Sequence, residues 1–349
     1  MYDETERYMI SLDARLRSLE NGRSQQSGLS DLFNALAVKA ADLSRLISRG
    51  DGLGDAVGAL NADGDPQKAL DVMADAQFLE AVKETGLVAA YCSEERESAL
   101  ILDRDAPLVV AIDPLDGSSN IGVNVSIGTI ISVLPNPGGD LEKAAMQRGD
   151  QQLAAAFFVY GPQTTLYLST GEGTDFYRLD PATGLFILVE SGIKIPAETS
   201  EYAINASNAR HWFAPFQRYV NDMLLGADGP RDRDFNMRWT ASLVADAARI
   251  FNRGGIFLYP CDRRPKYENG RLRLIYEANP ISLLVEQADG AASDGVDRIL
   301  VKQPTDIHQR TGLVFGSKTE VRWVENYELE SQQGLDQSPL FSNRNLFRS

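Results

Sequence analysis

Apolar residues recur at every third or fourth position near the start of the chain, and this spacing predicts amphipathic helices. Residues 8–50 should contain two such helices, the second ending at Gly50. Residues 67–85 predict a further helix, which Gly86 should end. The intervening residues 52–65 are rich in Gly, Asn and Asp, so we expect a loop there.

Short runs of apolar and β-branched residues, bounded by Gly and Pro, predict strands in the rest of the chain. We expect strands at residues 87–92, 108–112, 123–134, 157–160, 165–169, 185–189, 256–259 and 272–276. Further helices are expected at residues 214–224, 242–252 and 281–288. Residues 196–200 indicate a joint, so we predict an α/β protein with two halves, residues 1–195 and 196–330. A polar tail, residues 331–349, is either disordered or packed on a partner subunit.

The strand predicted at residues 108–112 runs directly into two carboxylates, Asp113 and Asp116, on either side of Pro114. Proline fixes its own φ and disfavours helix at the residue before it, so the strand must turn here. Buried carboxylates are costly unless they are hydrogen-bonded or neutralised. A hard divalent cation is therefore their natural partner.

A glycine and two serines follow these aspartates. Gly117, Ser118 and Ser119 offer exposed amides and hydroxyls, which are suited to holding a phosphate. For an isolated Asp-Gly-Ser run, the alternative is an Asx-type turn with a serine N-cap.

Other acidic residues have weaker signals of their own. Glu94 and Glu95 follow residues 87–92, although an isolated acidic turn is more often a solvated surface turn. Asp65 and Asp71 lie in the predicted loop and helix, where each would be an ordinary surface residue.

Glu277 follows the strand predicted at residues 272–276. Side chains alternate between the faces of a strand, so Arg271, Arg273 and Glu277 should share one charged face. A solvated edge would explain this face equally well. Together, the carboxylates suggest a site with oxygen ligands only, which selects Mg²⁺ or Mn²⁺ rather than zinc.

Charge and cysteine content limit the classes of function. The chain has 49 Asp and Glu against 34 Lys and Arg, and a net charge of -15, which opposes sequence-independent binding to nucleic acid or to an anionic membrane. Its two cysteines are too few for a disulfide framework. The N-terminal residues lack the pattern of a secretory signal. We therefore expect a cytoplasmic protein without nucleic-acid or membrane partners.

Several longer motifs resemble those of class I fructose-1,6-bisphosphatases, a family within the inositol monophosphatase-like superfamily. They are SEE at residues 93–95, DPLDGSSNIGVNVSIGT at 113–129, GGIFLYP at 254–260, LRLIYEANP at 272–280 and QPTDIHQR at 303–310. The resemblance implies a layered α-β-α-β-α sandwich of the sugar phosphatase type. It also implies Mg²⁺-dependent hydrolysis of the 1-phosphate of fructose 1,6-bisphosphate, in gluconeogenesis or Calvin-type carbon metabolism.

By position, the resemblance implies a catalytic centre. Two or more Mg²⁺ ions would be held by Glu94, Asp113, the carbonyl of Leu115, Asp116 and Glu277. The attacking water would be activated by Asp71 and Glu95, and a catalytic loop would contain Asn61 and Asp65. The phosphate being cleaved would be held by Asp116, Gly117, Ser118 and Ser119.

The resemblance also implies a sugar site and an oligomer. The sugar and its other phosphate would be surrounded by Asn205, Asn208, Tyr259 and Arg271. Arg238 matches an arginine that reaches into a neighbouring subunit's site, which implies a homotetramer.

The chain departs from the family at several of these positions. Arg271 replaces a lysine, and Trp239 replaces a tyrosine of the animal members. Asn208 and its neighbour Ala206 also differ from the usual residues, so the second phosphate pocket should be built differently. Pro107 and Leu108 replace nucleotide-binding residues, so AMP inhibition should be weak or absent.

Three alternatives to this activity stay open. The same chemistry could act on sedoheptulose 1,7-bisphosphate, alone or as a dual activity. A non-catalytic sugar-phosphate sensor is disfavoured because every catalytic carboxylate is present. An inositol phosphatase is disfavoured because the motifs beyond Asp116 follow the bisphosphatases.

Overall fold

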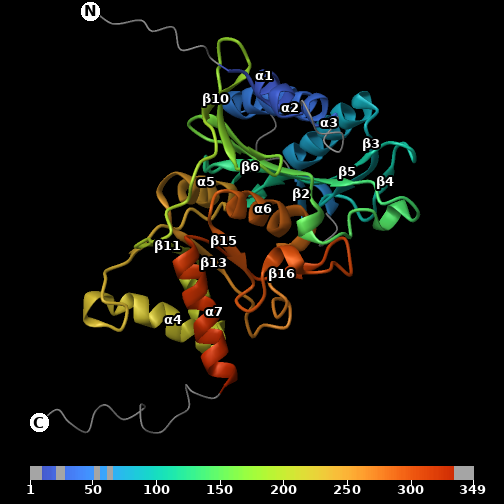
Figure 1. The fold of residues 1–349 in the computed structure, drawn as a ribbon. Helices are drawn as coiled ribbons and strands as arrows, with labels where there is room; N and C mark the ends of the chain where they lie inside the picture. Colours follow the sequence, from blue (N-terminus) through green and yellow to red (C-terminus); the bar gives the residue numbers. More distant parts are fainter. Residues whose placement is uncertain (1–9, 21–27, 51–55, 61–65, 334–349) are drawn as a thin grey trace, which may run out of the picture.

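The computed structural model describes residues 10–20, 28–50, 56–60 and 66–333, whose elements form alternating layers of helix and sheet (Figure 1). One face of a large sheet is covered by α1 (Leu12–Glu20), α2 (Leu29–Arg49) and α3 (Ala69–Thr85). Its other face packs on α5 (Leu243–Arg253) and α6 (Asn279–Gln287). Beyond them lies a smaller sheet, whose far side is covered by α4 (Ala214–Leu224) and α7 (Lys318–Gln332). The order α-β-α-β-α confirms the predicted fold class.

The large sheet has its strands in the order β10-β9-β8-β7-β6-β5-β3-β4. These strands are β3 (Val88–Ser93), β4 (Leu100–Ile101), β5 (Leu108–Asp116), β6 (Ile127–Pro135), β7 (Ala154–Tyr160), β8 (Thr164–Ser169), β9 (Asp175–Leu179) and β10 (Phe186–Glu190). From β5 to β10 each strand pairs antiparallel with the next. β3 and β5 instead pair in parallel, so both end at the same edge of the sheet.

The smaller sheet has the order β12-β11-β13-β17-β15. Its strands are β11 (Glu201–Ile204), β12 (Asn236–Met237), β13 (Ile256–Tyr259), β15 (Ala291–Ser293) and β17 (Leu313–Gly316). Two further antiparallel pairs are short: β1 (Ala56–Leu60) with β2 (Pro66–Lys68), and β14 (Leu272–Arg273) with β16 (Arg310–Thr311). The predicted joint near residue 196 falls between β10 and β11, and the division into two halves remains a prediction.

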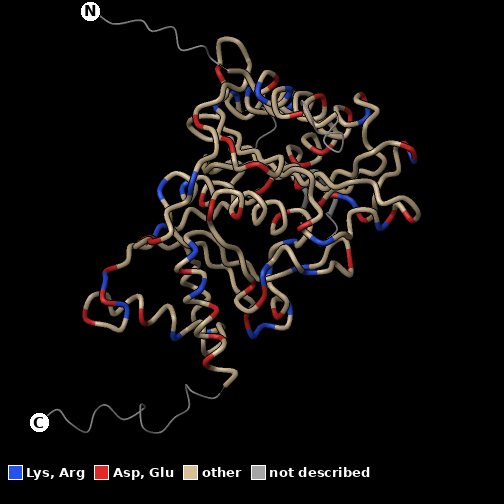
Figure 2. Tube along the Cα trace, in the orientation of Figure 1, with Lys and Arg blue, Asp and Glu red and all other residues tan. Residues whose placement is uncertain are grey.

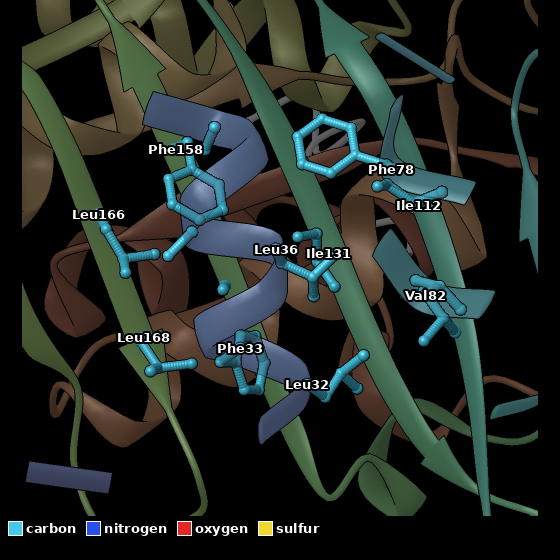
Figure 3. Close-up of a cluster of buried hydrophobic side chains, with 14 of the residues drawn as sticks. Leu32, Phe33, Leu36, Phe78, Val82, Ile112, Ile131, Phe158, Leu166 and Leu168 are labelled. Atoms are coloured by element: carbon cyan, nitrogen blue, oxygen red, sulfur yellow. The ribbon is translucent and has the colours of Figure 1, made fainter. Parts of the chain in front are cut away.

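Both faces of the large sheet are buried. On one face, α2 and α3 pack on strands β5 to β8 through the side chains drawn in Figure 3, which include Phe33, Leu36, Phe78, Ile112 and Phe158. Neighbouring residues of β6 serve opposite faces: Ile131 belongs to this cluster, and Ile130 belongs to a second cluster against α5 and α6. A strand buried on both faces does not need alternating polar residues, which explains the unbroken apolar run at residues 108–112 of β5.

The structure confirms several predicted elements and corrects others. The strand at residues 108–112 and the helices at residues 214–224 and 242–252 are present as β5, α4 and α5. The loop predicted at residues 52–65 is wrong in part, because residues 56–60 form β1. Residues 61–65 lie outside the described part of the chain, together with the predicted site residues Asn61 and Asp65.

The second half was predicted less well, and its strands β11, β15 and β17 were not predicted. The strand predicted at residues 272–276 is wrong beyond Arg273, because the chain turns into a π-helix, Leu274–Ala278. The helix α7 was not predicted. Its buried residues Val321, Val324 and Tyr327 are spaced by three but lie among charged residues, which hid the pattern. α7 extends to Gln332, so the predicted tail begins inside a helix, and residues 334–349 lie outside the described residues.

Candidate active site

A bulge at the end of β5 places Asp113 and Asp116 on the same side of the strand. Asp113 pairs with Ile130 and Asp116 with Gly128, so Pro114 and Leu115 together face the single residue Thr129. Residues three apart normally point to opposite faces, and the extra residue restores a common side. The Thr129 hydroxyl donates to the Pro114 carbonyl over 2.8 Å, which satisfies a carbonyl that the bulge removes from the ladder.

Glu277 joins these aspartates from the π-helix that precedes α6. Each of Asp113, Asp116 and Glu277 offers a carboxylate oxygen, and these oxygens lie within 4.8 Å of one another. Glu277 is 6% exposed, and its Oε2 accepts a hydrogen bond from the Arg273 amide. Arg273 is also buried. The solvated-edge alternative for this charged segment is therefore wrong.

Burial of the three carboxylates makes their charged forms unfavourable. Loss of solvation, followed by the charge of Glu94, raises the pKa of both Asp113 and Glu277 well above the ordinary range. Burial raises the pKa of Asp116 to about 6, although it accepts a hydrogen bond from the Val244 amide. A bound cation would reverse these shifts, and oxygen-only donors suit a hard divalent cation.

Glu94 and Glu95 come to the same edge because β3 runs parallel to β5. Ser93, the last residue of β3, is paired with Ile112, and the Glu94 amide donates to the Ile112 carbonyl over 3.0 Å. Burial, followed by the charge of Glu95, raises the pKa of Glu94 to about 7. Glu94 keeps 21% of its side chain exposed, and its Oε1 lies 3.6 Å from the Arg273 Nε. It therefore stands at the solvent side of the acidic cluster.

Asp71 lies in the first turn of α3, which packs on β3 and β5. It is only 3% exposed, so the interpretation as an ordinary surface residue is wrong. One turn further along α3, Asp75 is also buried.

Gly117, Ser118 and Ser119 form a tight turn next to Asp116. Gly117 has a φ of 84°, a left-handed conformation that favours glycine, and it precedes a short 3-10 helix, Ser118–Asn120. The Asn120 side-chain amide anchors the turn by donating to the Ala241 carbonyl over 2.9 Å. The predicted serine N-cap is wrong, because Gly117 holds the cap position. The Asx-type bond exists one step earlier, from the Leu115 amide to Asp113 Oδ1 over 3.0 Å.

The predicted sugar residues Tyr259 and Arg271 lie together. The Arg271 guanidinium carbon lies 5.6 Å from the Tyr259 ring centroid and 3.6 Å from that of Tyr267. Burial raises the pKa of Tyr259, although the charge of Arg271 opposes this shift. Away from this group and the acidic cluster, basic and acidic residues are mixed along the helices and loops (Figure 2).

Asn208 is joined to this group by Arg264, a residue that the sequence analysis missed. Arg264 Nη2 donates to Asn208 Oδ1 over 3.0 Å, and its guanidinium carbon lies 4.9 Å from the Tyr267 ring centroid. Asp262 in turn holds Arg264. The dense run of Arg, Lys and Tyr at residues 263–267 was the available signal. Asn205 caps the 3-10 helix Ala206–His211, which contains Asn208, and its Oδ1 accepts a hydrogen bond from the Ser207 amide over 3.2 Å.

Arg238 is not brought to the acidic cluster within one chain. Its side chain is 55% exposed, and its Nε lies 3.8 Å from Glu201 Oε1. The adjacent Trp239 stacks on Phe257, with ring centroids 5.8 Å apart. No helix within the described residues has the length and apolar character to cross a membrane.

The layered fold and the buried carboxylates beside a glycine-serine turn define a protein of the sugar phosphatase type. Residues 14–191 match the family model "Fructose-1-6-bisphosphatase, N-terminal domain", and residues 195–328 match the model of its C-terminal domain. The chain therefore belongs to the fructose-1,6-bisphosphatase family.

Individual relatives agree with this assignment. A fructose-1,6-bisphosphatase class 1 of Methylorubrum extorquens is 49% identical over 348 residues, which cover 99% of this chain and 100% of the relative. That of Rhizobium meliloti is 48% identical over 351 residues, covering 99% and 98% of the two chains. The crystal structure of Leishmania major fructose-1,6-bisphosphatase in holo form is similar, with a TM-score of 0.85 and 32% identity. The match covers 92% of this chain and 99% of that one.

Proposed function

We propose that this enzyme hydrolyses the 1-phosphate of fructose 1,6-bisphosphate, giving fructose 6-phosphate and phosphate. The observation that carries this proposal is the position of the Gly117 turn, which directly follows a cluster of carboxylate oxygens within 4.8 Å of one another. A phosphate monoester held at the turn would lie next to any cation bound by Asp113, Asp116 and Glu277. The substrate is taken from the names of the relatives, whose sequences match nearly all of this chain.

The donor set fits Mg²⁺, with Mn²⁺ as a second possibility. We assign the metal positions to Glu94, Asp113, the Leu115 carbonyl, Asp116 and Glu277, and we expect two or more ions for each subunit. The fit rests on buried carboxylates that raise one another's pKa and have no His or Cys among them. Bound cations would polarise the phosphoryl oxygens and neutralise charge on the leaving sugar oxygen.

The chain's own residues would orient the reactants. We assign the amides and hydroxyls of Gly117, Ser118 and Ser119 to the phosphoryl oxygens, because the left-handed Gly117 opens a turn in which Ser119 is exposed. Asp71 and Glu95 would orient the attacking water and accept its proton. Asp65 is assigned to the same step from the resemblance alone.

The sugar and the second phosphate are assigned to the group around Tyr267. Arg271 would bind the phosphate, and Tyr259 and Asn205 the sugar; this is supported by the contact of Arg271 with both tyrosine rings. Asn208 would act through Arg264, whose guanidinium binds its carbonyl oxygen. Sedoheptulose 1,7-bisphosphate stays a second candidate, because the same chemistry could act on its 1-phosphate.

We propose a homotetramer in which Arg238 reaches the neighbouring subunit's site. Its 55% exposed side chain supports this, since an arginine that serves another subunit must point outward. We also place the enzyme in the cytoplasm. The support is that Cys92 is buried and neither cysteine forms a disulfide in the described residues.

The proposal is tested by phosphate release from both bisphosphates, with and without Mg²⁺. We expect Mg²⁺-dependent release from fructose 1,6-bisphosphate, and ³¹P NMR should show loss of the 1-phosphate only. Faster release from the sedoheptulose sugar would favour the second candidate. Binding of the sugar without any release at saturating Mg²⁺ would favour a sensor and would contradict the proposal.

A further inference from the structure

An ion pair with one buried partner ties the Glu94–Glu95 turn to α3. Arg96, the next residue, places its Nη2 2.6 Å from Asp75 Oδ2, and Asp75 keeps only 7% of its side chain exposed. The Tyr91 hydroxyl donates to Asp75 Oδ1 over 3.0 Å, which fixes the carboxylate against β3. An ion pair with one buried partner and a third hydrogen bond holds its geometry far better than an exposed pair. The turn is therefore fastened on its α3 side.

His308 fastens the same turn on its opposite side. Its Nε2 lies 2.9 Å from the Arg96 carbonyl oxygen. A carbonyl can only accept a hydrogen bond, so Nε2 carries the hydrogen and donates it. The His308 ring also packs against Tyr276, with ring centroids 5.6 Å apart. Tyr276 immediately precedes Glu277, so one imidazole contacts two segments that carry acidic residues of the cluster.

The backbone of His308 completes the connection. Its carbonyl accepts a hydrogen bond from Arg273 Nη1 over 2.9 Å. Arg273 is 3% exposed, reaches Glu94 with its Nε and donates its amide to Glu277. Glu94 and Glu277 lie far apart in the sequence and in no common strand. Arg273 contacts both of them, and His308 holds the Arg273 guanidinium in place.

We propose that His308 is a positioning residue that holds the Glu94 turn and the Glu277 segment at the separation needed for cation binding. The inference rests on the proposed function of the acidic cluster. His308 does not need to touch the substrate. It acts on two segments that carry Glu94 and Glu277, whose carboxylates repel each other and would otherwise move apart toward solvent. Outer residues of this kind usually change metal affinity by about 10–100-fold when they are replaced.

The test compares two variants at one position. His308→Leu keeps an apolar contact with Tyr276 but removes the donor, while His308→Gln can still donate from a side-chain nitrogen. We expect His308→Leu to weaken Mn²⁺ binding, measured by electron paramagnetic resonance on the full chain without substrate, by about 10–100-fold. His308→Gln should recover most of the affinity. Asp75→Asn, which loosens the turn from the α3 side, should weaken binding in the same direction.

The matched control is Thr305→Val in the same loop. It removes the bond from the Thr305 hydroxyl to Gln309 Oε1 and touches neither Arg96 nor Arg273. It should bind Mn²⁺ as the unaltered chain does. Wild-type Mn²⁺ affinity in His308→Leu would overturn the inference. Equal weakening of Mn²⁺ binding in His308→Leu and His308→Gln would overturn the role of the Nε2 donor. A lower melting temperature of His308→Leu with unchanged Mn²⁺ affinity would show that His308 only stabilises the fold, which would also overturn the inference.

Activity adds a second readout. The Mg²⁺ concentration for half-maximal rate should rise in His308→Leu, while the KM for the sugar and the rate at saturating Mg²⁺ should stay near those of the unaltered enzyme. A rise in KM alone would contradict positioning of the metal residues. If the unaltered chain releases no phosphate, the proposed function fails, and the Mn²⁺ comparison still decides the inference.

Discussion

Asp116 of β5 accepts a hydrogen bond from the amide of Val244, 3.1 Å away, in the first turn of α5. The positive end of the helix dipole and an amide without an intrahelical partner thus stabilise the charged form of Asp116, which burial disfavours. This contact requires Gly128, because a Cβ there would lie 2.2 Å from the Phe158 carbonyl oxygen and 2.6 Å from Val244 Cγ2. The bulged strand, the glycine and the helix form one unit.

Gly128→Ala should therefore damage both stability and activity. The added methyl group must displace α5 or β7, and overpacking of this kind lowers the free energy of unfolding by about 1–3 kcal/mol or more. Turnover should fall because the Val244 amide moves away from Asp116. Chemical denaturation and phosphate release measure the two effects. Gly139→Ala is the control for turnover: its Cβ would meet nothing within 4 Å, so its cost comes only from the left-handed φ of 71°. An equal loss of turnover there would contradict a specific effect of the clash at Gly128.

Glu277→Ala should abolish most of the Mg²⁺-dependent turnover. Removing a group that organises the charge opposite the transition state costs at least about 10²-fold in rate. The fold should persist, because the substitution removes a buried charge that repels Glu94 and Asp116. Assays at saturating Mg²⁺ with Asp105→Ala, an exposed acid away from the cluster, serve as the comparison. Near-normal turnover in Glu277→Ala would remove Glu277 from the site.

Without metal, stability should fall as the pH rises. In the folded protein the pKa of Asp116 rises from 3.8 to about 6, and that of Glu94 from 4.5 to about 7. The folded state therefore binds these protons more tightly than the unfolded state. Their contribution to stability is complete below the unfolded pKa and is lost as the pH passes through the folded values.

Melting temperatures in EDTA should thus decrease from about pH 4 to about pH 7. Mg²⁺ should restore stability most strongly at the upper end of this range, by about 2.7 kcal/mol when its concentration is 100 times its Kd. Asp116→Asn should flatten the dependence. A melting temperature that increases with pH across this window in EDTA would contradict the assignment of the raised pKa values.

The ion pair between Arg231 and Glu320 should contribute strongly to the packing of α7. Both side chains are almost fully buried, at 2% and 0% exposure, and the Tyr219 hydroxyl donates to Glu320 over 3.0 Å. Breaking a buried pair leaves an uncompensated charge, so Glu320→Gln should lower the free energy of unfolding by about 3–5 kcal/mol. Denaturant titration measures this.

An exposed pair provides the control for that measurement. Lys194 and Asp289 are 57% and 62% exposed, so Asp289→Asn should change stability by less than about 1 kcal/mol. The double substitution of Arg231→Met with Glu320→Leu should be far milder than Glu320→Gln. If it is more harmful, the pair itself, rather than an unpaired charge, stabilises this region.

The first acidic segment could be predicted well from sequence. An apolar run ending at Asp113, Pro114 and Asp116 has few structural solutions, and β5 confirmed the strand. The turn expected at Pro114 is wrong, because the strand continues through a bulge to Asp116. The relation of this segment to Glu277 could not be derived in the same way. Period-two alternation suited residues 272–276, but a π-helix formed because Glu277 accepts the Arg273 amide and the chain continues into α6.

Contacts between distant segments were the least predictable. Arg264 binds Asn208 across 56 positions, and His308 reaches the Arg96 carbonyl across 212. Neither contact leaves a periodic signal. The distance along the chain between His308 and the acidic motifs hides this contact from sequence reasoning. Asp71 resembled a surface residue because a helix pattern does not reveal how deeply its first turn is buried.

Because β3 and β5 pair in parallel, the geometry of the acidic cluster does not depend on the length of the chain between these two strands. A hairpin of two antiparallel strands would fix its register through the connecting turn. Here the register is set by the ladder from Val88–Leu108 to Ser93–Ile112, while the connection runs out through β4 at the edge of the sheet. An insertion among the exposed residues 103–105 should therefore leave Glu94 in place relative to Asp113.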